Sequence, residues 1–221
     1  MRFTRIIAGA ITAGLVGLVP VAISSPASAT ENLTTTTTLE QNYGESVITY
    51  GEEASLVAAV LASNGRSAPY GTVTLYQYTP QNPVWTPVET IASGGYAPFT
   101  NVKPLTNASY KAVFSGSTAT ATFQDNYAPS ESVPVAIGVK RKAVFKTPGL
   151  FLVGKIKPDF GKKKVILKRK KGKKYVAWKK VRTNGKGQFR VKAPNQRGFK
   201  FSVTIPSDSK FTGFTDFYQV Y

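Results

Sequence analysis

Residues 164–182 have the sequence KVILKRKKGKKYVAWKKVR, and this stretch indicates the fold. Apolar and basic side chains alternate at its start, so Val165 and Leu167 are expected to face a core while the neighbouring lysines face solvent. Lys171-Gly172 is a turn signal between this segment and a second one that contains β-branched and aromatic residues. The pattern therefore predicts a β-hairpin with strands at residues 164–168 and 175–181.

The rest of the chain repeats this pattern of short strands and turns. Segments rich in β-branched and aromatic residues are separated by turn signals such as Asn64-Gly65 and Asn184-Gly185. Strands at such short, regular spacing predict a β-sandwich or a barrel, and no segment after residue 29 shows a helical period of useful length. The further predicted strands are residues 55–60, 72–76, 110–114, 150–156, 187–192 and 199–205.

The two halves of the chain also resemble each other at an offset of about 90 residues. Val73-Thr74-Leu75 and Trp85 in the first half match Val165-Ile166-Leu167 and Trp178 in the second. An immunoglobulin-sized sandwich has about 100 residues, so the offset predicts one sandwich in each half. The expected fold class is all-β, with two tandem immunoglobulin-like β-sandwiches after a signal peptide.

The first 29 residues are predicted to be a secretory signal peptide. Arg2 and Arg5 form a positive start, residues 6–23 are mostly apolar or small, and Ala27-Ser28-Ala29 is a small-x-small cleavage box. The alternative is an uncleaved membrane anchor, but the apolar run is short and Gly-rich. No later stretch reaches the ~20 apolar residues of a spanning helix, so no transmembrane segment is expected after cleavage. We expect the mature chain to be secreted, either extracellular or associated with the cell wall.

Charge divides the mature chain into two unlike halves. Residues 30–136 hold three Lys or Arg and eight Asp or Glu, a formal charge of −5, whereas residues 137–221 hold 24 Lys or Arg and three Asp, a formal charge of +21. The step follows a stretch rich in Pro, Ser and Ala, which marks a domain boundary. The predicted organisation is a signal peptide at 1–29, an acidic sandwich at 30–136 and a lysine-rich sandwich at 137–221.

The chain has no Cys and no His, and this excludes several kinds of chemistry. Without Cys there is no disulfide, thiolate metal site or Cys nucleophile, and without His there is no Ser-His-Asp triad or histidine metal ligand. The acidic residues show neither EF-hand spacing nor the paired arrangement of a glycosidase. We therefore expect no catalytic residues, no metal site and no cofactor, and a protein that is not an enzyme.

Both halves resemble domains of secreted bacterial proteins. Residues 34–39, 48–51, 71–75 and 110–116 make the segment from Thr34 to Val135 similar to a group-3 type bacterial immunoglobulin-like domain. Residues 154–158, 164–167, 178–181 and 185–189 resemble a related sandwich that is common in secreted actinobacterial proteins. The resemblance implies a tandem protein for surface display, adhesion or spacing, with no catalytic residue. The lysine content of the second half departs from the usual mixed charge of such domains.

The strongest functional signal is the lysine density of residues 162–182, where 12 of 21 residues are Lys or Arg and none is acidic. Adjacent strands lie ~4.8 Å apart, within the ~8 Å Debye length at physiological salt, so these charges repel one another unless counterions neutralise them. An anionic polymer that displaced the counterions would gain their release entropy. The candidate polyanion-binding residues are Lys162, Lys163, Lys164, Lys168, Arg169, Lys170, Lys171, Lys173, Lys174, Tyr175, Lys179, Lys180 and Arg182.

Aromatic residues lie between the basic ones, and they are expected to divide into two groups. Tyr175, beside the hairpin tip, is the preferred contact for a ligand ring, because aromatic side chains stack on bases and sugars. Trp178 and Phe189 are expected in the core, as are Trp85 and Phe99 of the first half.

These observations predict a secreted, non-enzymatic cell-surface binding protein whose basic second domain attaches electrostatically to a wall polymer, an acidic glycan or an anionic lipid. Nucleic acid is a further polyanion but is not favoured for a secreted protein, and lysine in excess over arginine favours diffuse attraction over bidentate recognition. The alternative is a passive immunoglobulin-like adhesion or spacer module that contacts a protein partner, with a lysine face that aids solubility. Self-association between the acidic and basic domains is another interaction to test.

Overall fold

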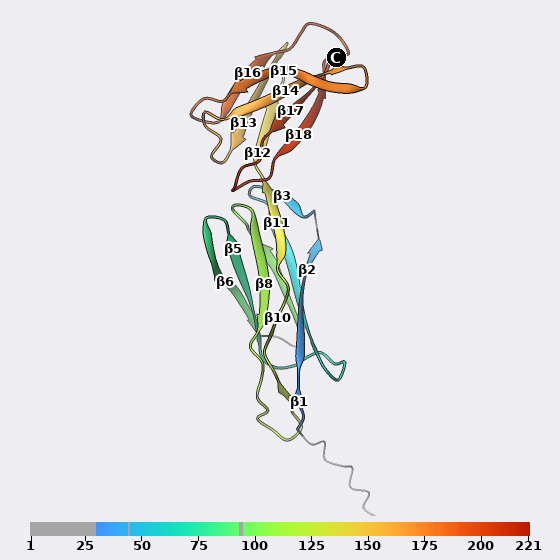
Figure 1. Cartoon of the computed structure of the whole chain (residues 1–221), viewed down its shortest axis with the longest axis vertical. Coiled ribbons are helices and arrows are strands. Elements are labelled where there is room, and N and C mark those ends of the chain that lie inside the picture. The colour runs from blue at the N-terminus through green and yellow to red at the C-terminus, as the bar shows by residue number, and fades with distance from the viewer. Residues whose placement is uncertain (1–29, 44, 93–94) are drawn as a thin grey trace, which may run out of the picture.

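The computed structural model describes residues 30–43, 45–92 and 95–221, so the predicted signal peptide lies outside the described residues. Figure 1 shows two β-domains stacked end to end along the long axis of the molecule. The regular elements of the described residues are all β-strands, and this part of the chain contains no helix long and apolar enough to span a membrane. The predicted all-β tandem architecture is confirmed.

The first domain packs a three-stranded sheet against a larger one. The smaller sheet has the order β2 (Thr35–Tyr43), β4 (Ala54–Ala62) and β7 (Tyr96–Val102). The larger sheet has the order β3 (Val47–Thr49), β11 (Val135–Lys140), β8 (Ala108–Phe114), β5 (Thr72–Thr79) and β6 (Asn82–Ala92), and β10 (Ser130–Glu131) also pairs with β8. Two short parallel strands, β1 (Asn32–Leu33) and β9 (Asn126–Tyr127), form a separate small sheet.

Strict alternation builds the core of the first domain. Every second residue of β4 and β8 is buried, which places Leu56 and Ala58 of one sheet against Ala112 and Phe114 of the other. Phe99, expected in this core, is fully buried. Trp85, by contrast, is only half-buried and packs against the Tyr78 ring on the outer side of the larger sheet. The expectation of a core role for Trp85 was therefore wrong.

The second domain is a seven-stranded antiparallel sandwich. One sheet has the order β12 (Lys142–Lys146), β13 (Phe151–Lys157) and β16 (Gln188–Lys192). The other has the order β15 (Lys174–Arg182), β14 (Lys164–Lys171), β17 (Lys200–Ile205) and β18 (Phe214–Gln219). Val165 and Leu167 are fully buried against Phe201 and Val203 of the adjacent strand and against Leu152 of the opposite sheet. The alternation that predicted the hairpin therefore places its apolar residues in the core.

The first domain extends four residues beyond the boundary that the charge step suggests. β11 pairs in parallel with β3 and antiparallel with β8, so Ile137 and Val139 complete the core of the first domain. Only Arg141 separates β11 from β12, the first strand of the second domain. β11, the last strand of the first sandwich, runs past the charge step. It ends in Lys140, which is the first basic residue of the lysine-rich half.

A loop of the second domain is docked into the first domain. Phe211, in the loop between β17 and β18, is 1% exposed and lies in the core of the first domain, where its ring meets Tyr50 edge to face. The Thr212 amide donates to the Val139 carbonyl at 2.8 Å, and the Asn107 amide donates to the Lys210 carbonyl at 2.8 Å. We call this joint the elbow. It consists of Arg141, residues 206–213 and the strand ends that these residues contact.

A buried arginine lies at the centre of the elbow. The Arg141 side chain is 0% exposed, and its guanidinium donates to the Pro158 carbonyl and to the Asp208 carboxylate, at 2.9 Å and 2.6 Å. The guanidinium carbon lies 4.2 Å from the centroid of the Phe211 ring and 5.1 Å from that of Phe160. The elbow is therefore a packed and hydrogen-bonded joint, and Arg141 is the one residue of the chain between the last strand of the first sandwich and the first strand of the second.

Candidate polyanion interface

The predicted basic hairpin is present and longer than expected. β14 and β15 pair from Lys164 opposite Arg182 to Lys171 opposite Lys174, with a register shift after Leu167. The two-residue turn holds Gly172 at a φ of 60°, and a side chain there would meet nothing within 4 Å. A glycine with positive φ at the first turn position followed by a residue with negative φ is typical of a type II′ hairpin turn. The turn therefore needs glycine for its backbone conformation rather than for space.

The hairpin residues divide between two faces. Lys164, Ile166, Lys168 and Lys170 alternate with the buried Val165 and Leu167 and therefore lie on the outer face of the four-stranded sheet. The strand register places four partners from β15 on that face, namely Tyr175, Ala177, Lys180 and Arg182. The opposite face of the hairpin carries Arg169, Lys171, Lys174 and Lys179.

The candidate residues also separate into a base and a tip. Lys162, Lys163 and Lys164 lie at the end of the hairpin near the elbow, whereas we define the hairpin tip as Lys170, Lys171, Lys173 and Lys174. At ~3.3 Å per residue the two ends of β14 are about 23 Å apart, or about three Debye lengths at physiological salt. Lys168 and Lys180 lie between these two ends, so the basic side chains run along the whole length of the hairpin.

Three of the candidate residues are engaged in internal contacts. The Lys163 ammonium forms an ion pair with the Asp208 carboxylate at 2.7 Å. Arg182 donates to the Lys162 carbonyl at 2.9 Å, and Lys179 donates to the Lys192 carbonyl at 3.2 Å while it lies over the Trp178 ring. Within the described part of the chain the tip lysines form no ion pair with a carboxylate. The charge of the tip is therefore not compensated by these carboxylates.

A basic groove lies beside the tip. Its volume is about 380 Å³, and it separates the hairpin from the loop that joins β16 to β17. Lys200, at the start of β17, adds a positive charge that the selection of residues 162–182 did not include. The residues that line this groove are Arg169, Lys170, Lys171, Gln196, Gly198, Phe199 and Lys200.

The aromatic residues are placed largely as expected. Phe189 is buried, and Trp178 is half-buried, with its ring centroid 5.1 Å from that of Phe199 and 5.7 Å from that of Phe201, so it packs at the margin of the core. Tyr175 lies on the outer face, where its ring meets Phe217 at 5.2 Å. Phe217 is 65% exposed. Sequence patterns do not single out Phe217, because only the strand order brings β18 into the same sheet as the hairpin.

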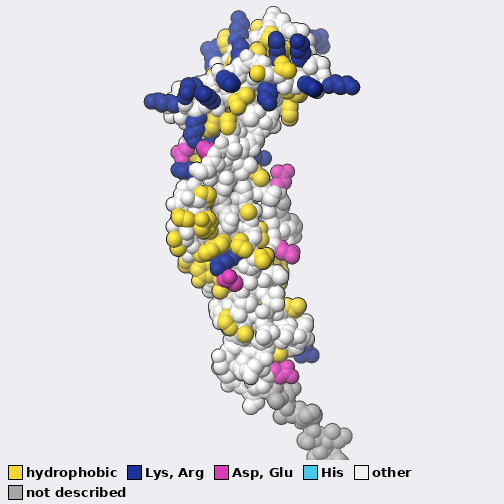
Figure 2. Space-filling view, in the orientation of Figure 1, with side chains coloured by type: hydrophobic (Ala, Val, Ile, Leu, Met, Phe, Trp, Pro, Cys, Tyr) yellow, Lys and Arg dark blue, Asp and Glu magenta, His cyan; other side chains and the backbone are white. Residues whose placement is uncertain are grey.

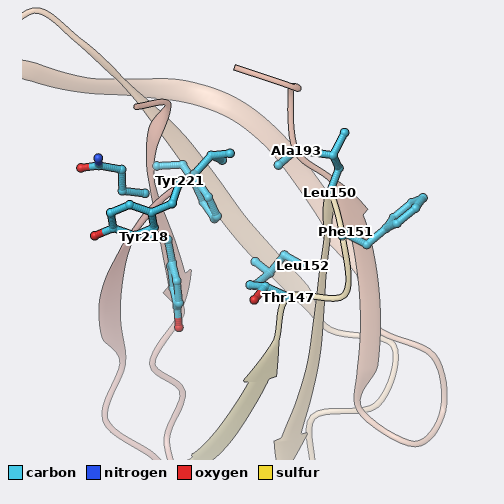
Figure 3. Close-up of a pocket in the computed structure, with 11 residues that line it drawn as sticks. Thr147, Leu150, Phe151, Leu152, Ala193, Tyr218 and Tyr221 are labelled. Atoms are coloured by element: carbon cyan, nitrogen blue, oxygen red, sulfur yellow. The ribbon is translucent and has the colours of Figure 1, made fainter. Parts of the chain in front are cut away.

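An apolar cavity of about 260 Å³ opens at the end of the second domain that lies away from the elbow (Figure 3). Tyr218 and Tyr221 lie on one side of it and Leu150 and Leu152 on the other, while Phe151 points away. Burial, together with the nearby Asp216 charge, raises the pKa of Tyr218 to about 12, so this phenol is neutral at physiological pH. The side chains of the described residues that line the cavity carry no charge.

Basic side chains are spread over the second domain. Figure 2 shows Lys and Arg scattered over the visible face of the upper domain among apolar and other side chains, whereas the visible Asp and Glu are scattered over the first domain and lie near the elbow. At the elbow, Asp159 pairs with Lys210, and Asp208 pairs with Arg141 and Lys163. The surface farther from the elbow is therefore almost purely cationic.

No protein-family model matches the chain, and no curated protein matches it. Among solved structures, it is similar to a tetra-tandem repeat in the extending region of a large adhesion protein, with 12% identity over 84% of this chain and a TM-score of 0.42. The chain spans about half of that structure, namely 48% of its length. It is also similar to a segment of two fibronectin type III domains from chicken tenascin, with 10% identity over 86% of this chain and 98% of that one and a TM-score of 0.41. Both neighbours are tandem-domain segments, and at this identity the likeness concerns the fold alone.

Proposed function

We propose that the chain is a secreted, non-enzymatic binding module whose second domain attaches electrostatically to anionic polymers of a cell surface. The observation that carries this proposal is the segregation of charge between the two sandwiches. Residues 142–221 hold 22 Lys or Arg and three Asp, a formal charge of +19, and two of the three Asp are paired at the elbow. The segments that resemble group-3 type bacterial immunoglobulin-like domains and actinobacterial sandwiches support the same proposal.

The chemistry of the surface favours a polymer over a small ligand. Cationic side chains spread over a domain attract any chain of closely spaced anionic groups, and the released counterions provide the driving force. Lysine is a compact point charge without the planar fork with which arginine recognises one phosphate or carboxylate. The ligand class is therefore a polyanion with closely spaced charges, such as a wall polymer, an acidic glycan or the anionic surface of a membrane.

The decisive test is the salt dependence of binding by the mature chain. Retention on purified cell wall and on immobilised inorganic polyphosphate is measured at about 50 mM and about 200 mM salt, a range over which polyanion affinity falls steeply. A variant with Lys170→Gln, Lys171→Gln, Lys173→Gln and Lys174→Gln is expected to bind more weakly and to lower the log–log salt slope by about 3. The matched control carries Arg at the same four positions and is expected to bind like the wild type.

Two results would contradict the proposal. One is wild-type retention that does not change with salt, and the other is equal binding by the Gln and Arg variants. Circular dichroism and thermal unfolding of each variant establish that the comparison is made between folded proteins. The tip side chains are exposed, so these substitutions are expected to leave stability within about 0.5 kcal/mol of the wild type.

The alternative of a passive adhesion or spacer module has its own support on the first domain. Val84 and Val88 of β6 are 60% and 48% exposed, and the Trp85 ring contacts both the Tyr78 ring and the Lys111 ammonium. Exposed apolar groups beside aromatic rings are typical of surfaces that contact another protein. Under this alternative, polymer binding is negligible at every salt concentration.

A further inference from the structure

The three-stranded sheet of the second domain presents a second basic face, on the other side of the core from the outer face of the hairpin sheet. Ala143 and Phe145 of β12 and Ile156 of β13 point inward and pack in the core. Alternation then directs the intervening residues of these strands to solvent. The outward residues are Lys142, Val144 and Lys146 on β12, Val153, Lys155 and Lys157 on β13, and Gln188, Arg190 and Lys192 on β16.

The strand register gathers four lysines around two valines. Lys142 lies directly opposite Lys157, Val144 opposite Lys155, and Lys146 opposite Val153. Like charges at directly opposed positions of a sheet are destabilising, so the folding of this sheet does not account for the Lys142–Lys157 pair. Within the described residues none of the four lysines forms an ion pair with a carboxylate. Their charge is therefore available to an external anion.

These side chains form a groove rather than a flat surface. The groove has a volume of about 530 Å³ and is lined by the four lysines with Val144, Val153, Gly154 and Gln188. Val144 is 49% exposed, so the groove is partly apolar and its rim is cationic. Lys155 and Lys157 are two residues apart on β13 and therefore about 7 Å apart along the strand. Lys142 and Lys146 are four residues apart on β12, or about 13 Å. This arrangement fits a linear chain whose anionic groups are separated by short uncharged units.

Arg190 is held beside the groove and extends its positive field. The guanidinium carbon of Arg190 lies 3.7 Å from the centroid of the Phe151 ring, on the outer side of the same sheet. A cation stacked on an aromatic ring in this way keeps a defined position with little loss of its charge. The face is therefore cationic over β16 as well as over the lysine groove.

We propose that this groove is a second polyanion-binding site and that the second domain is consequently bivalent, holding one polymer strand on each side of the sandwich. This inference rests on the proposed function, because it assumes that the ligand is a polyanion. The two sheets pack about 10 Å apart, and the side chains on both outer faces widen the separation. A single straight strand cannot cover both faces, so the domain cross-links two strands, or two segments of one long strand.

The experiment uses the mature chain with two lengths of inorganic polyphosphate. A short chain, unable to reach both faces, gives the number of strands bound per protein by calorimetry, and a long chain reports cross-linking by light scattering at low salt. The groove variant carries Lys142→Gln, Lys146→Gln, Lys155→Gln and Lys157→Gln. Its matched comparison is the variant with four Gln at the hairpin tip, which removes the same charge from the hairpin.

The wild type is expected to bind two short chains and to scatter light strongly with the long one. The groove variant is expected to bind one short chain and to lose cross-linking, the tip variant to bind its hairpin strand more weakly, and the eight-site variant to show both effects. One short chain per wild-type protein, or undiminished cross-linking by the groove variant, would overturn bivalency while leaving the proposed function intact. If the wild type binds no polyphosphate at low salt, both proposals fail together. The wild-type stoichiometry depends on no substitution, so the test stands even if a variant is unstable.

Discussion

At the scale of single residues, the elbow contains an ionic arrangement that is rare inside proteins. Arg141 is fully buried and always charged, so its desolvation must be offset by a partner. Asp208 provides it, and the same carboxylate oxygen also accepts from Lys163, while the other accepts from the backbone amides of Lys210 and Phe211. One Asp thus neutralises the buried cation and shapes the loop that docks into the first domain.

These contacts act on the ionisation of Asp208. Burial opposes the charged form, but the hydrogen bonds from Lys163 and Arg141 and the positive charge of Arg141 outweigh it and hold the pKa of the carboxyl well below its usual range. A carboxyl with a depressed pKa stabilises the fold fully above the ordinary Asp value of about 3.9. That contribution is lost as the pH falls below this value toward the lower pKa of the folded state.

We expect Asp208→Asn to lower the free energy of unfolding at pH 7 by about 1–3 kcal/mol. The range lies below the ~3–5 kcal/mol typical of breaking a fully buried pair because Asp208 is 31% exposed. The amide oxygen of Asn still accepts from the loop amides, so the change isolates the charge. Urea unfolding at pH 7 and pH 3 is the measurement, and the loss is expected to shrink at pH 3.

The matched control is Asp159→Asn. Asp159 is 66% exposed, lies 3.8 Å from Lys210 and has a φ of 50°, which Asn adopts readily. This variant is expected to stay within about 0.5 kcal/mol of the wild type. Equal losses in the two Asn variants would mean that the buried Arg141 does not depend on Asp208.

At the scale of elements, the hairpin shows what alternation can and cannot predict. Alternation correctly predicts Val165 and Leu167 in the core, because the first half of β14 follows period two and the strand is central in its sheet. β6 was not predicted because it is an edge strand that contains Pro83 and Pro87 and shows no alternation.

The lysine groove was missed for another reason. Lys142 and Lys157 face each other only through the register of β12 and β13, which composition does not reveal.

The outer-face pair of Tyr175 and Phe217 allows charge and ring stacking to be distinguished. Phe217 is 65% exposed, so Phe217→Ala is expected to cost little stability. Aromatic stacking on a ring contributes about 1–3 kcal/mol, so affinity for an acidic polysaccharide should fall about five- to 150-fold. Affinity for inorganic polyphosphate, which has no ring, is expected to be unchanged. Binding isotherms with both polymers at one salt concentration test this.

Other results would assign Phe217 a different role. An equal loss of affinity for both polymers would indicate that the substitution disturbs the lysine positions rather than removing a stacking surface. Unchanged affinity for both would mean that the aromatic pair only shields the sheet below it, where Ser202, opposite Phe217, is 2% exposed. Tyr175→Phe is the conservative control, because it keeps the ring and removes only the hydroxyl.

At the scale of the whole molecule, the elbow decides whether the two charged domains behave as one body. Charge composition alone predicted two domains, but it could not show their joint, whose partners are far apart in sequence. Arg141 and Asp208 are 67 residues apart, and Asn107 bonds to Thr212 over a separation of 105. These contacts hold the acidic and basic sandwiches end to end (Figure 1) and thus oppose folding back of one on the other. Association between the acidic domain of one chain and the basic domain of another stays a separate prediction, which salt-dependent oligomer size would test.

Phe211 is the residue whose removal should uncouple the domains. It belongs to the second domain by sequence and to the core of the first by packing, and it also covers the Arg141 guanidinium. A buried Phe→Ala change lowers the free energy of unfolding by about 3–5 kcal/mol, and here the contacts that are lost are those of the elbow. We expect wild-type calorimetry to give one cooperative transition and Phe211→Ala to give two, with a broader distribution of interdomain distances in solution scattering.

Phe217→Ala, the exposed counterpart in the same domain, is expected to retain the single transition. Two transitions in the wild type would show that the sandwiches unfold independently, and the elbow would then be a contact without mechanical consequence.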